Sequence, residues 1–294
     1  MDHYMRSVFG KKACKVPIDG GFTCPNRDGS KGFGGCSFCS EKGSGEFTAG
    51  RELGISRQID IGADMMRRKW KDAVIIPYFQ SFTGTYAPLE TLKKLYEEAL
   101  SHPLSRGLCI ATRPDCITDE TAKYLHALAS EHFLMLELGL QTIHDDIAAR
   151  FNRCYTYNEF LKGYDKVSDL FTCIHLINGL PGETREMMLE NAEEIGKLRP
   201  RAVKLHLLHV LDDTPLAEEY KNGNYRPMER SDYIATVCDQ LEVLPQETVI
   251  ERVTGDGMDS KLLAPLWSRK KLTVQNDIDK QLYLRNSWQG KKAL

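Results

Sequence analysis

Hydrophobic and polar residues follow two different periods along this chain. Short runs rich in apolar and β-branched residues recur between turn residues, and such runs are typical of strands buried in a sheet. Six strands are predicted in this way, at Ala13–Ile18, Ala73–Phe79, Gly107–Ala111, Phe133–Gly139, Phe171–Ile177 and Ala202–Leu208.

The longer stretches between these runs repeat their apolar residues at helical spacing. One example is the set Leu89, Leu92, Leu95, Tyr96 and Ala99, and Pro88 suits the first turn of this helix. The predicted helices are Ile55–Lys71, Leu89–Ser101, Asp119–Ser130, Tyr157–Asp169, Arg185–Leu198 and Arg230–Leu244.

Six strands that are each followed by a helix predict an α/β fold with a parallel sheet and helices on its outer face. Right-handed crossovers curl such a sheet into a partial (βα)6 TIM-like barrel that is open on one side. Residues 1–244 are expected to form this core, with residues 245–294 as a C-terminal extension packed on it. Ligands of such a sheet bind at the C-terminal ends of its strands.

Composition places the chain among ordinary globular proteins. Its 294 residues can bury a large core, and 27% of them are charged and 41% hydrophobic. No apolar run approaches the roughly 18 residues needed to span a bilayer, and the first residues lack a signal-peptide core. We therefore expect a cytoplasmic protein without membrane contact, whose nine cysteines are reduced.

The net charge of −2 does not by itself indicate a nucleic-acid-binding protein. Basic residues do gather locally, at Met66–Lys71, at Ser268–Lys271 and at Lys291 with Lys292. Such runs are usually solvated faces, but they can also hold phosphate groups.

Three cysteines on a glycine-rich segment carry the strongest chemical signal. Cys24, Cys36 and Cys39 can hold three corners of a [4Fe-4S] cluster and leave the fourth iron open to a small molecule. The glycines between them let backbone N–H groups approach sulfur atoms closely. The Cys-x-x-Cys spacing also suits a zinc site, with Cys14 or a later cysteine as fourth ligand, although Cys14 lies in a predicted strand.

The segment Asp19–Gly29 and the long interval before Cys36-Ser37-Phe38-Cys39 resemble the cluster loop of Elp3-like radical S-adenosylmethionine (SAM) proteins, in particular the YhcC/YtqA (MnmL-type) subfamily. The commoner CxxxCxxC spacing is absent, and so is an acetyltransferase domain. Further matching segments are Gln80–Tyr86, Glu137–Thr142, His175–Glu183 and Leu263–Trp267.

This resemblance implies a radical SAM barrel whose cluster loop is residues 19–40. It implies Cys24, Cys36 and Cys39 as ligands of a [4Fe-4S] cluster and S-adenosyl-L-methionine as the molecule bound at the open iron. One electron then cleaves SAM to methionine and a 5′-deoxyadenosyl radical, which takes a hydrogen atom from the substrate.

Polar residues at the predicted strand ends are expected to bind SAM. By position, Gln80 and Ser81 correspond to the Gly-Gly-Glu segment with which radical SAM enzymes meet the methionine amino group. Glu137 and Gln141 could reach the ribose or the sulfonium. The remaining expected SAM ligands are Arg153, whose guanidinium suits the methionine carboxylate, and Gly179, beside which the adenine could pass.

A second group of polar residues is a candidate for substrate binding. His175, Lys204, His206 and His209 alternate with apolar residues on two neighbouring strands, so they could bind substrate or transfer protons if they face inward. Arg113, which follows the third strand, suits a phosphate or carboxylate. The alternative for each is a structural residue, either a core histidine or a turn residue.

The resemblance implies tRNA as the substrate, because Elp3-like proteins act on the C5 substituent of the wobble uridine. The subfamily suggests conversion of carboxymethylaminomethyluridine to aminomethyluridine, with a flavodoxin- or ferredoxin-type protein as electron donor. Two alternatives stay open: radical SAM chemistry on a peptide or small metabolite, and a zinc-stabilised nucleic-acid-binding module.

Overall fold

All six predicted strands form in the computed structural model, which describes residues 1–255 and 260–293. Each agrees with its prediction to within two residues at either end. The strands are β1 (Ala13–Ile18), β2 (Val74–Phe79), β3 (Leu108–Thr112), β4 (Leu134–Gln141), β5 (Phe171–Asn178) and β6 (Ala202–Leu207).

The six predicted helices also form, and all but one of them end within two residues of their predicted ends. Helix α6 ends at Asp165 rather than Asp169, because the amides of Val167 and Leu170 bond to carbonyls three residues back and bury both side chains in tight turns. The six helices are α2 (Gly54–Lys69), α3 (Leu89–Ser101), α4 (Asp119–Glu131), α6 (Tyr157–Asp165), α7 (Arg185–Lys197) and α9 (Arg230–Val243).

Several short elements were not predicted individually. The chain adds four helices, three further strands and three 3-10 helices to the predicted set within the described residues. They are α1 (Asp2–Phe9), α5 (Asp145–Arg150), α8 (Pro215–Lys221), α10 (Lys271–Leu284), β7 (Val210–Leu211), β8 (Val249–Arg252), β9 (Leu262–Ala264), η1 (Arg51–Leu53), η2 (Pro114–Cys116) and η3 (Leu266–Arg269).

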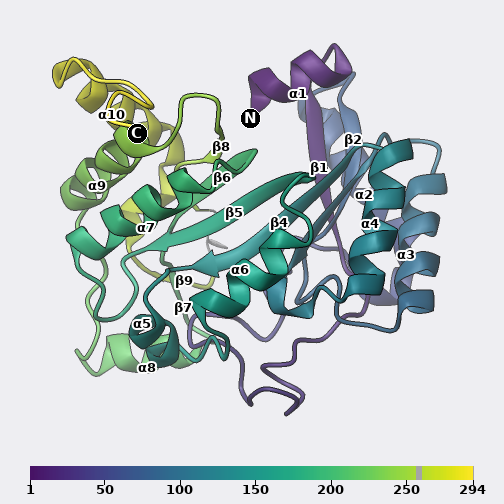
Figure 1. The fold of residues 1–294 in the computed structure, drawn as a ribbon, viewed down its shortest axis with the longest axis horizontal. Coiled ribbons are helices and arrows are strands. Elements are labelled where there is room, and N and C mark those ends of the chain that lie inside the picture. Colours follow the sequence, from purple (N-terminus) through teal and green to yellow (C-terminus); the bar gives the residue numbers. More distant parts are fainter. Residues whose placement is uncertain (256–259, 294) are drawn as a thin grey trace. The chain divides into compact units, whose positions relative to one another are not determined.

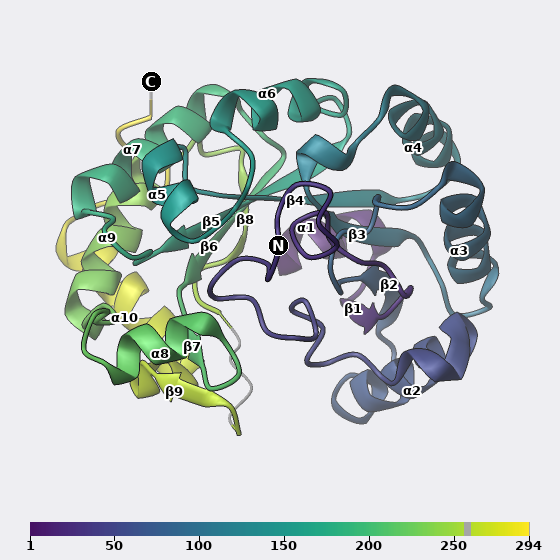
Figure 2. The same cartoon turned by 90° about the horizontal axis from the view of Figure 1, so that it is seen from below.

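The first of two compact units consists of residues 1–31, 42–139 and 158–172. Its strands β1, β2, β3 and β4 pair in parallel in that order, with Ala13 opposite Val74 and Leu108 opposite Leu134. Figures 1 and 2 show α2, α3 and α4 along one side of these strands. Every residue of β2 is buried, as expected for a central strand of a parallel sheet.

The second unit consists of residues 32–41, 140–157 and 173–294. Strands β5, β6 and β8 pair in parallel in that order, while β7 and β9 form a separate antiparallel pair. Helices α7 and α9 pack side by side (Figure 1). The buried amides of Asn178 and Gln240 bond to each other at 2.8 Å in both directions, which fixes α9 against β5.

The predicted α/β class with parallel strands is confirmed. Seven strands pair in parallel rather than the predicted six, because β8 from the C-terminal segment joins the edge of β6. The boundary between residues 244 and 245 stays a prediction. Among the described residues, no helix is both long and apolar enough to cross a bilayer.

Candidate cluster and cofactor site

Cys24 lies on a tight turn that follows β1 in the first unit. Its carbonyl accepts hydrogen bonds from the amides of Arg27 at 2.8 Å and Asp28 at 3.2 Å, and the Lys31 amide donates to the Pro25 carbonyl at 2.8 Å. Cys24 is a free cysteine and partly exposed. Hydrogen bonds therefore hold the backbone of this turn, while Cys24 stays partly exposed.

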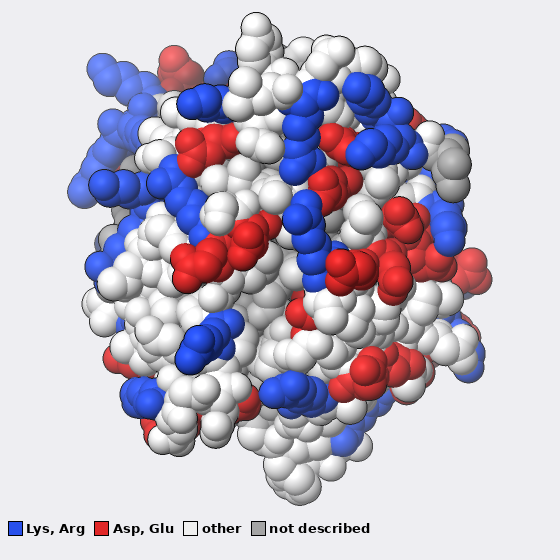
Figure 3. Space-filling view, turned by 90° about the vertical axis from the view of Figure 1, so that its left-hand side faces the viewer, with Lys and Arg blue, Asp and Glu red and all other residues white. Residues whose placement is uncertain are grey.

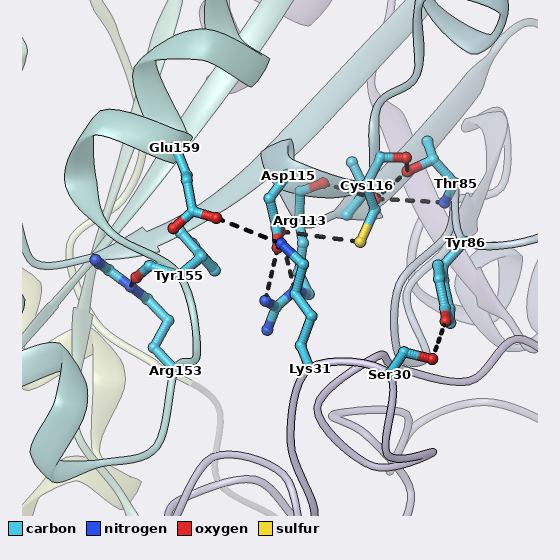
Figure 4. Close-up of polar contacts among 11 residues, drawn as sticks. Ser30, Lys31, Thr85, Tyr86, Arg113, Asp115, Cys116, Arg153, Tyr155 and Glu159 are labelled. Atoms are coloured by element: carbon cyan, nitrogen blue, oxygen red, sulfur yellow. Dashed lines mark hydrogen bonds and ion pairs between the residues drawn. The ribbon is translucent and has the colours of Figure 1, made fainter.

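Lys31 ties the far end of this turn to the residues after β3 (Figure 4). Its ammonium lies 2.6 Å from Asp115, which the guanidinium of Arg113 also binds, with donor–acceptor distances of 3.1 and 2.9 Å. Burial alone would lower the pKa of Lys31, but its hydrogen bond to Asp115 and the nearby carboxylate of Glu159 raise it. Arg113, predicted as a phosphate or carboxylate ligand, here binds a carboxylate of its own chain.

Cys36 and Cys39 lie on a turn in the second unit. The Cys39 amide donates to the Cys36 carbonyl at 2.9 Å. Between them, Ser37 is held from two sides: its amide donates to the Phe151 carbonyl at 3.0 Å, and its carbonyl accepts from the Leu216 amide at 2.9 Å. The Cys-x-x-Cys turn is thus anchored by its backbone.

Side chains support the same turn. Phe38 packs against Phe151 with ring centroids 5.3 Å apart. Phe151 belongs to an apolar core of the second unit, and Phe38 is partly buried against that core. The amide of Asn152 donates to the carbonyls of Phe33 at 3.0 Å and Gly35 at 2.8 Å. Gly35 has φ 79°, a conformation that disfavours any residue with a Cβ.

The thiols of this segment suit iron or another thiophilic metal. Cys24, Cys36 and Cys39 are partly exposed, whereas five of the other six cysteines are buried. Cys14, considered as a fourth zinc ligand, lies within β1, and burial raises the pKa of its thiol. A thiol that resists ionisation is a poor metal ligand, so the donor set on this segment fits a three-cysteine cluster better than a zinc site completed by Cys14.

Glu137, predicted to contact SAM, is fully buried in β4 of the first unit. Its carboxylate binds the ammonium of Lys15 on β1 and accepts a 2.5 Å hydrogen bond from the hydroxyl of Tyr78 on β2. Lys15 also lies over the ring of Tyr78. Sequence reasoning missed this triad, because Lys15, Tyr78 and Glu137 lie on three different strands that only the folded sheet brings together.

Gln80 and Ser81 follow β2, as predicted. Gln80 donates from its side-chain amide to the Ser44 carbonyl at 2.8 Å. Ser81 is buried, and its hydroxyl has no hydrogen-bond partner among the described residues. Their roles in binding SAM stay predictions.

Arg153 is the largest fully buried side chain among the described residues. Its guanidinium donates to the carbonyls of Leu140, Thr142 and Tyr155 at 2.6–2.8 Å and pairs with Asp145 at 3.1 Å. These contacts hold the chain after β4 in place. Whether Arg153 also binds the methionine carboxylate stays a prediction.

Two further predicted SAM ligands lie where the backbone turns sharply. Gln141 ends β4 with φ 69°, an uncommon conformation for a residue with a side chain. Gly179 follows β5 with φ 86°, and its carbonyl accepts a 2.8 Å hydrogen bond from the Tyr225 hydroxyl. Gly179, Glu183 and Tyr225 line one surface pocket of the second unit.

Glu183, the last residue of the Leu-Pro-Gly-Glu segment, has a desolvated carboxyl. Burial raises its pKa to about 8, although hydrogen bonds from the Leu180 amide and the Asn191 side chain act in the opposite direction. The next residue, Thr184, accepts a hydrogen bond from the Met187 amide and so caps α7.

His175, Lys204 and His206 share one face of the paired strands β5 and β6, as predicted. Burial, together with the charges of Arg252 and Lys204, holds the pKa of His206 well below its usual range. Burial likewise lowers the pKa of His209, to about 4. Both rings are therefore neutral at pH 7, which suits hydrogen bonding rather than the donation of a proton.

Two matches to family descriptions establish the class of protein. Residues 24–195 match the radical SAM superfamily, and residues 200–283 match the radical SAM C-terminal domain. The chain belongs to the radical SAM superfamily, whose members use a [4Fe-4S] cluster and S-adenosylmethionine.

Full-length relatives narrow this assignment. The chain is 42% identical to "Uncharacterized protein YtqA" of Bacillus subtilis, over 99% of this chain and 91% of that protein. It is 33% identical to "Protein YhcC" of Escherichia coli K12, over 93% and 88% of the two chains. The predicted YhcC/YtqA relationship is thereby confirmed.

More distant relatives include a tRNA enzyme and a protein of known structure. A tRNA uridine(34) acetyltransferase of Methanocaldococcus jannaschii is 28% identical over 57% of this chain and 31% of its own length. The structure of Methanocaldococcus infernus Elp3 aligns with a TM-score of 0.69 at 19% identity, over 94% of this chain and 64% of that one. This likeness and the family match confirm the predicted partial TIM-like radical SAM fold.

Proposed function

We propose that this protein is a radical SAM enzyme that converts carboxymethylaminomethyluridine to aminomethyluridine at the wobble position of tRNA. Membership of the superfamily supports an enzyme, and the similarity to a tRNA uridine(34) acetyltransferase is the observation that carries the choice of substrate. The similarity covers only part of that protein's length. A different reaction at the same nucleotide agrees with this partial match.

Cys24, Cys36 and Cys39 are the proposed ligands of the cluster. Their support is the spacing in the sequence, the accessible thiols, and the backbone anchors that hold each turn. When bound, the reduced cluster cleaves SAM and so supplies a radical that removes a hydrogen atom from substrate. Phe38, which lies within the Cys-x-x-Cys turn and packs on Phe151, would help to keep water from the cluster.

The proposed reaction has three steps, in which atoms and electrons balance. A hydrogen atom leaves the CH₂ group between the secondary amine and the carboxylate. The resulting carbon radical gives up one electron to a one-electron acceptor and one proton from nitrogen, which forms a C=N bond. Water then adds to this carbon and the C–N bond breaks, which leaves aminomethyluridine and glyoxylate.

The polar residues at the strand ends are the proposed binding groups. Gln80, Ser81, Glu137, Gln141, Arg153 and Gly179 are assigned to SAM. His175, Lys204, His206, His209 and Arg113 are assigned to substrate, with His206 and His209 neutral because burial lowers the pKa of both rings.

Partners and location follow from the same proposal. The enzyme would act on tRNA in the cytoplasm and take electrons from a flavodoxin- or ferredoxin-type protein. On the face that Figure 3 shows, over α9 and α10, basic and acidic side chains are interleaved. This face is therefore not uniformly basic, and the proposal of tRNA as substrate does not rest on it.

Deleting the gene tests this proposal in cells. Mass spectrometry of total tRNA nucleosides should show that carboxymethylaminomethyluridine accumulates while aminomethyluridine and its derivatives decline. The wild-type gene should restore the profile, and a Cys36→Ala gene should not. An unchanged nucleoside profile in the deletion strain would overturn the proposed substrate.

A further inference from the structure

One face of the sheet in the second unit carries a compact group of metal-binding side chains. On β5, Asn178 bonds to Gln240 of α9 and so faces the helices. Side chains alternate along a strand, so Cys173 and His175 face the opposite side. The pairing of His175 with Lys204 places Lys204 of β6 on that same side.

A β-bulge adds a carboxylate to this group. Val203 of β6 pairs with Ile250 of β8, but the next residue, Lys204, pairs with Arg252. Glu251 is therefore the extra residue of a bulge, a feature that re-aims side chains and is common beside functional sites. Its carboxylate lies 3.2 Å from the thiol of Cys173 and 3.2 Å from the ammonium of Lys204.

The geometry of this group fits a metal ion. One ligand atom each from Cys173, His175 and Glu251 lies within 4.8 Å of the other two. Tetrahedral zinc, with bonds of about 2.0–2.3 Å, holds its ligand atoms about 3.3–3.8 Å apart. The sulfur and the carboxylate oxygen, 3.2 Å apart, are slightly closer than that spacing, so small side-chain movements would close the site.

Neighbouring residues orient two of the three ligands. Lys204 holds Oε1 of Glu251, so Oε2 is the atom that faces Cys173, and both of these charged side chains are only 5% exposed. The ring of His175 stacks on His206 with centroids 5.7 Å apart. Such outer contacts are typical supports of metal ligands.

We propose that Cys173, His175 and Glu251 bind one divalent transition metal ion, zinc by the chemistry of the ligands. A thiolate and a carboxylate neutralise the charge of the ion, so Lys204 does not face a net positive complex. Three protein ligands leave a position for water, as in catalytic zinc sites. Metal binding at this group does not depend on the proposed function.

Metal analysis of the reconstituted, desalted chain tests this inference. We expect about one zinc per chain beside the iron of the cluster after incubation with one equivalent of zinc. Cys173→Ala and Glu251→Gln should lose the zinc and keep the iron, whereas Cys36→Ala should lose the iron and keep the zinc. Cys238→Ala, which removes another buried cysteine of the same unit, should keep both.

Cobalt gives a second readout that does not depend on activity. In the Cys36→Ala chain, added Co²⁺ should produce a thiolate-to-cobalt charge-transfer band that Cys173→Ser removes and Cys238→Ala does not. Zinc that binds equally well to the Cys173 and Glu251 variants, or no zinc on the wild-type chain, would overturn the inference. Neither result would bear on the deletion experiment, which tests the proposed function separately.

Discussion

Asp115 shows how one residue can order a cofactor loop from outside it. Its side chain is 3% exposed and binds both Lys31, which belongs to the segment between Cys24 and Cys36, and Arg113. Removing the negative charge leaves two cations without this partner in a largely buried place, a change that costs about 3 kcal/mol.

We therefore expect Asp115→Asn to lower the free energy of unfolding by about that amount and to speed the loss of iron to a chelator. Urea titration and iron release under anaerobic conditions measure the two effects. Glu159→Gln is the matched control, because Glu159 lies 3.6 Å from Lys31 but is 43% exposed, so its ion pair contributes little. Equal behaviour of the two variants would show that Asp115 does not anchor the loop.

Glu183 makes stability depend on pH. Burial raises its pKa in the folded chain to about 8, from an ordinary value of 4.5. Between these values the folded chain keeps a proton that the unfolded chain releases, so stability falls as pH rises through this interval. The free energy of unfolding falls by at most about 1.4 kcal/mol for each pH unit in this range.

In Glu183→Gln the free energy of unfolding should accordingly decline less between pH 5 and pH 8. The stability of this variant relative to wild type should be highest at pH 8. Urea midpoints at each pH measure this slope. Glu193→Gln, at an exposed position of the following helix α7, should leave the slope unchanged. A wild-type slope in Glu183→Gln would mean that the carboxyl is not protonated in the folded chain.

At the scale of single residues, the sequence indicated which side chains are polar at strand ends but not what they touch. Arg153 was expected to meet a ligand, yet backbone carbonyls and Asp145 surround its guanidinium. The partners Lys15 and Tyr78 of Glu137 were not predicted, since they come from other strands.

Secondary structure was predicted well wherever one period ran without interruption. The strand Ala13–Ile18 and the helix Leu89–Ser101 have the predicted ends. Short elements such as β8 were not located, because four half-buried residues give no clear period. The bulge that turns Glu251 depends on pairing with β6 and has no signature in its own sequence.

Helix α6 packs against η2 through a glycine. A Cβ atom on Gly163 would lie 2.2 Å from the backbone carbonyl of Pro114, which cannot move as a side chain can. Overpacking of this kind costs about 1–3 kcal/mol, whereas alanine in place of glycine gains about 1 kcal/mol within a helix.

Gly163→Ala should therefore be less stable than wild type, with the helix displaced from the 3-10 turn that carries Asp115. Urea unfolding measures the change, and Lys162→Ala, an exposed neighbour on the same helix, should stay close to wild type. A gain of stability in Gly163→Ala would mean that α6 is not packed so closely.

For the molecule as a whole, family and fold followed from the cysteine segment and the alternation of strands and helices, while the substrate did not. The family match, the full-length similarity to YtqA and the Elp3 fold agree with one another. The specific reaction rests on a more distant relative that acts on tRNA uridine(34).

The central claim is tested most directly by incubating the reconstituted chain with SAM, a reductant and tRNA that carries carboxymethylaminomethyluridine. Mass spectrometry of the nucleosides should show its conversion to aminomethyluridine, with 5′-deoxyadenosine formed in step, and the Cys36→Ala chain should form neither product. Cleavage of SAM by the wild-type chain with the tRNA nucleoside left unchanged would contradict the account.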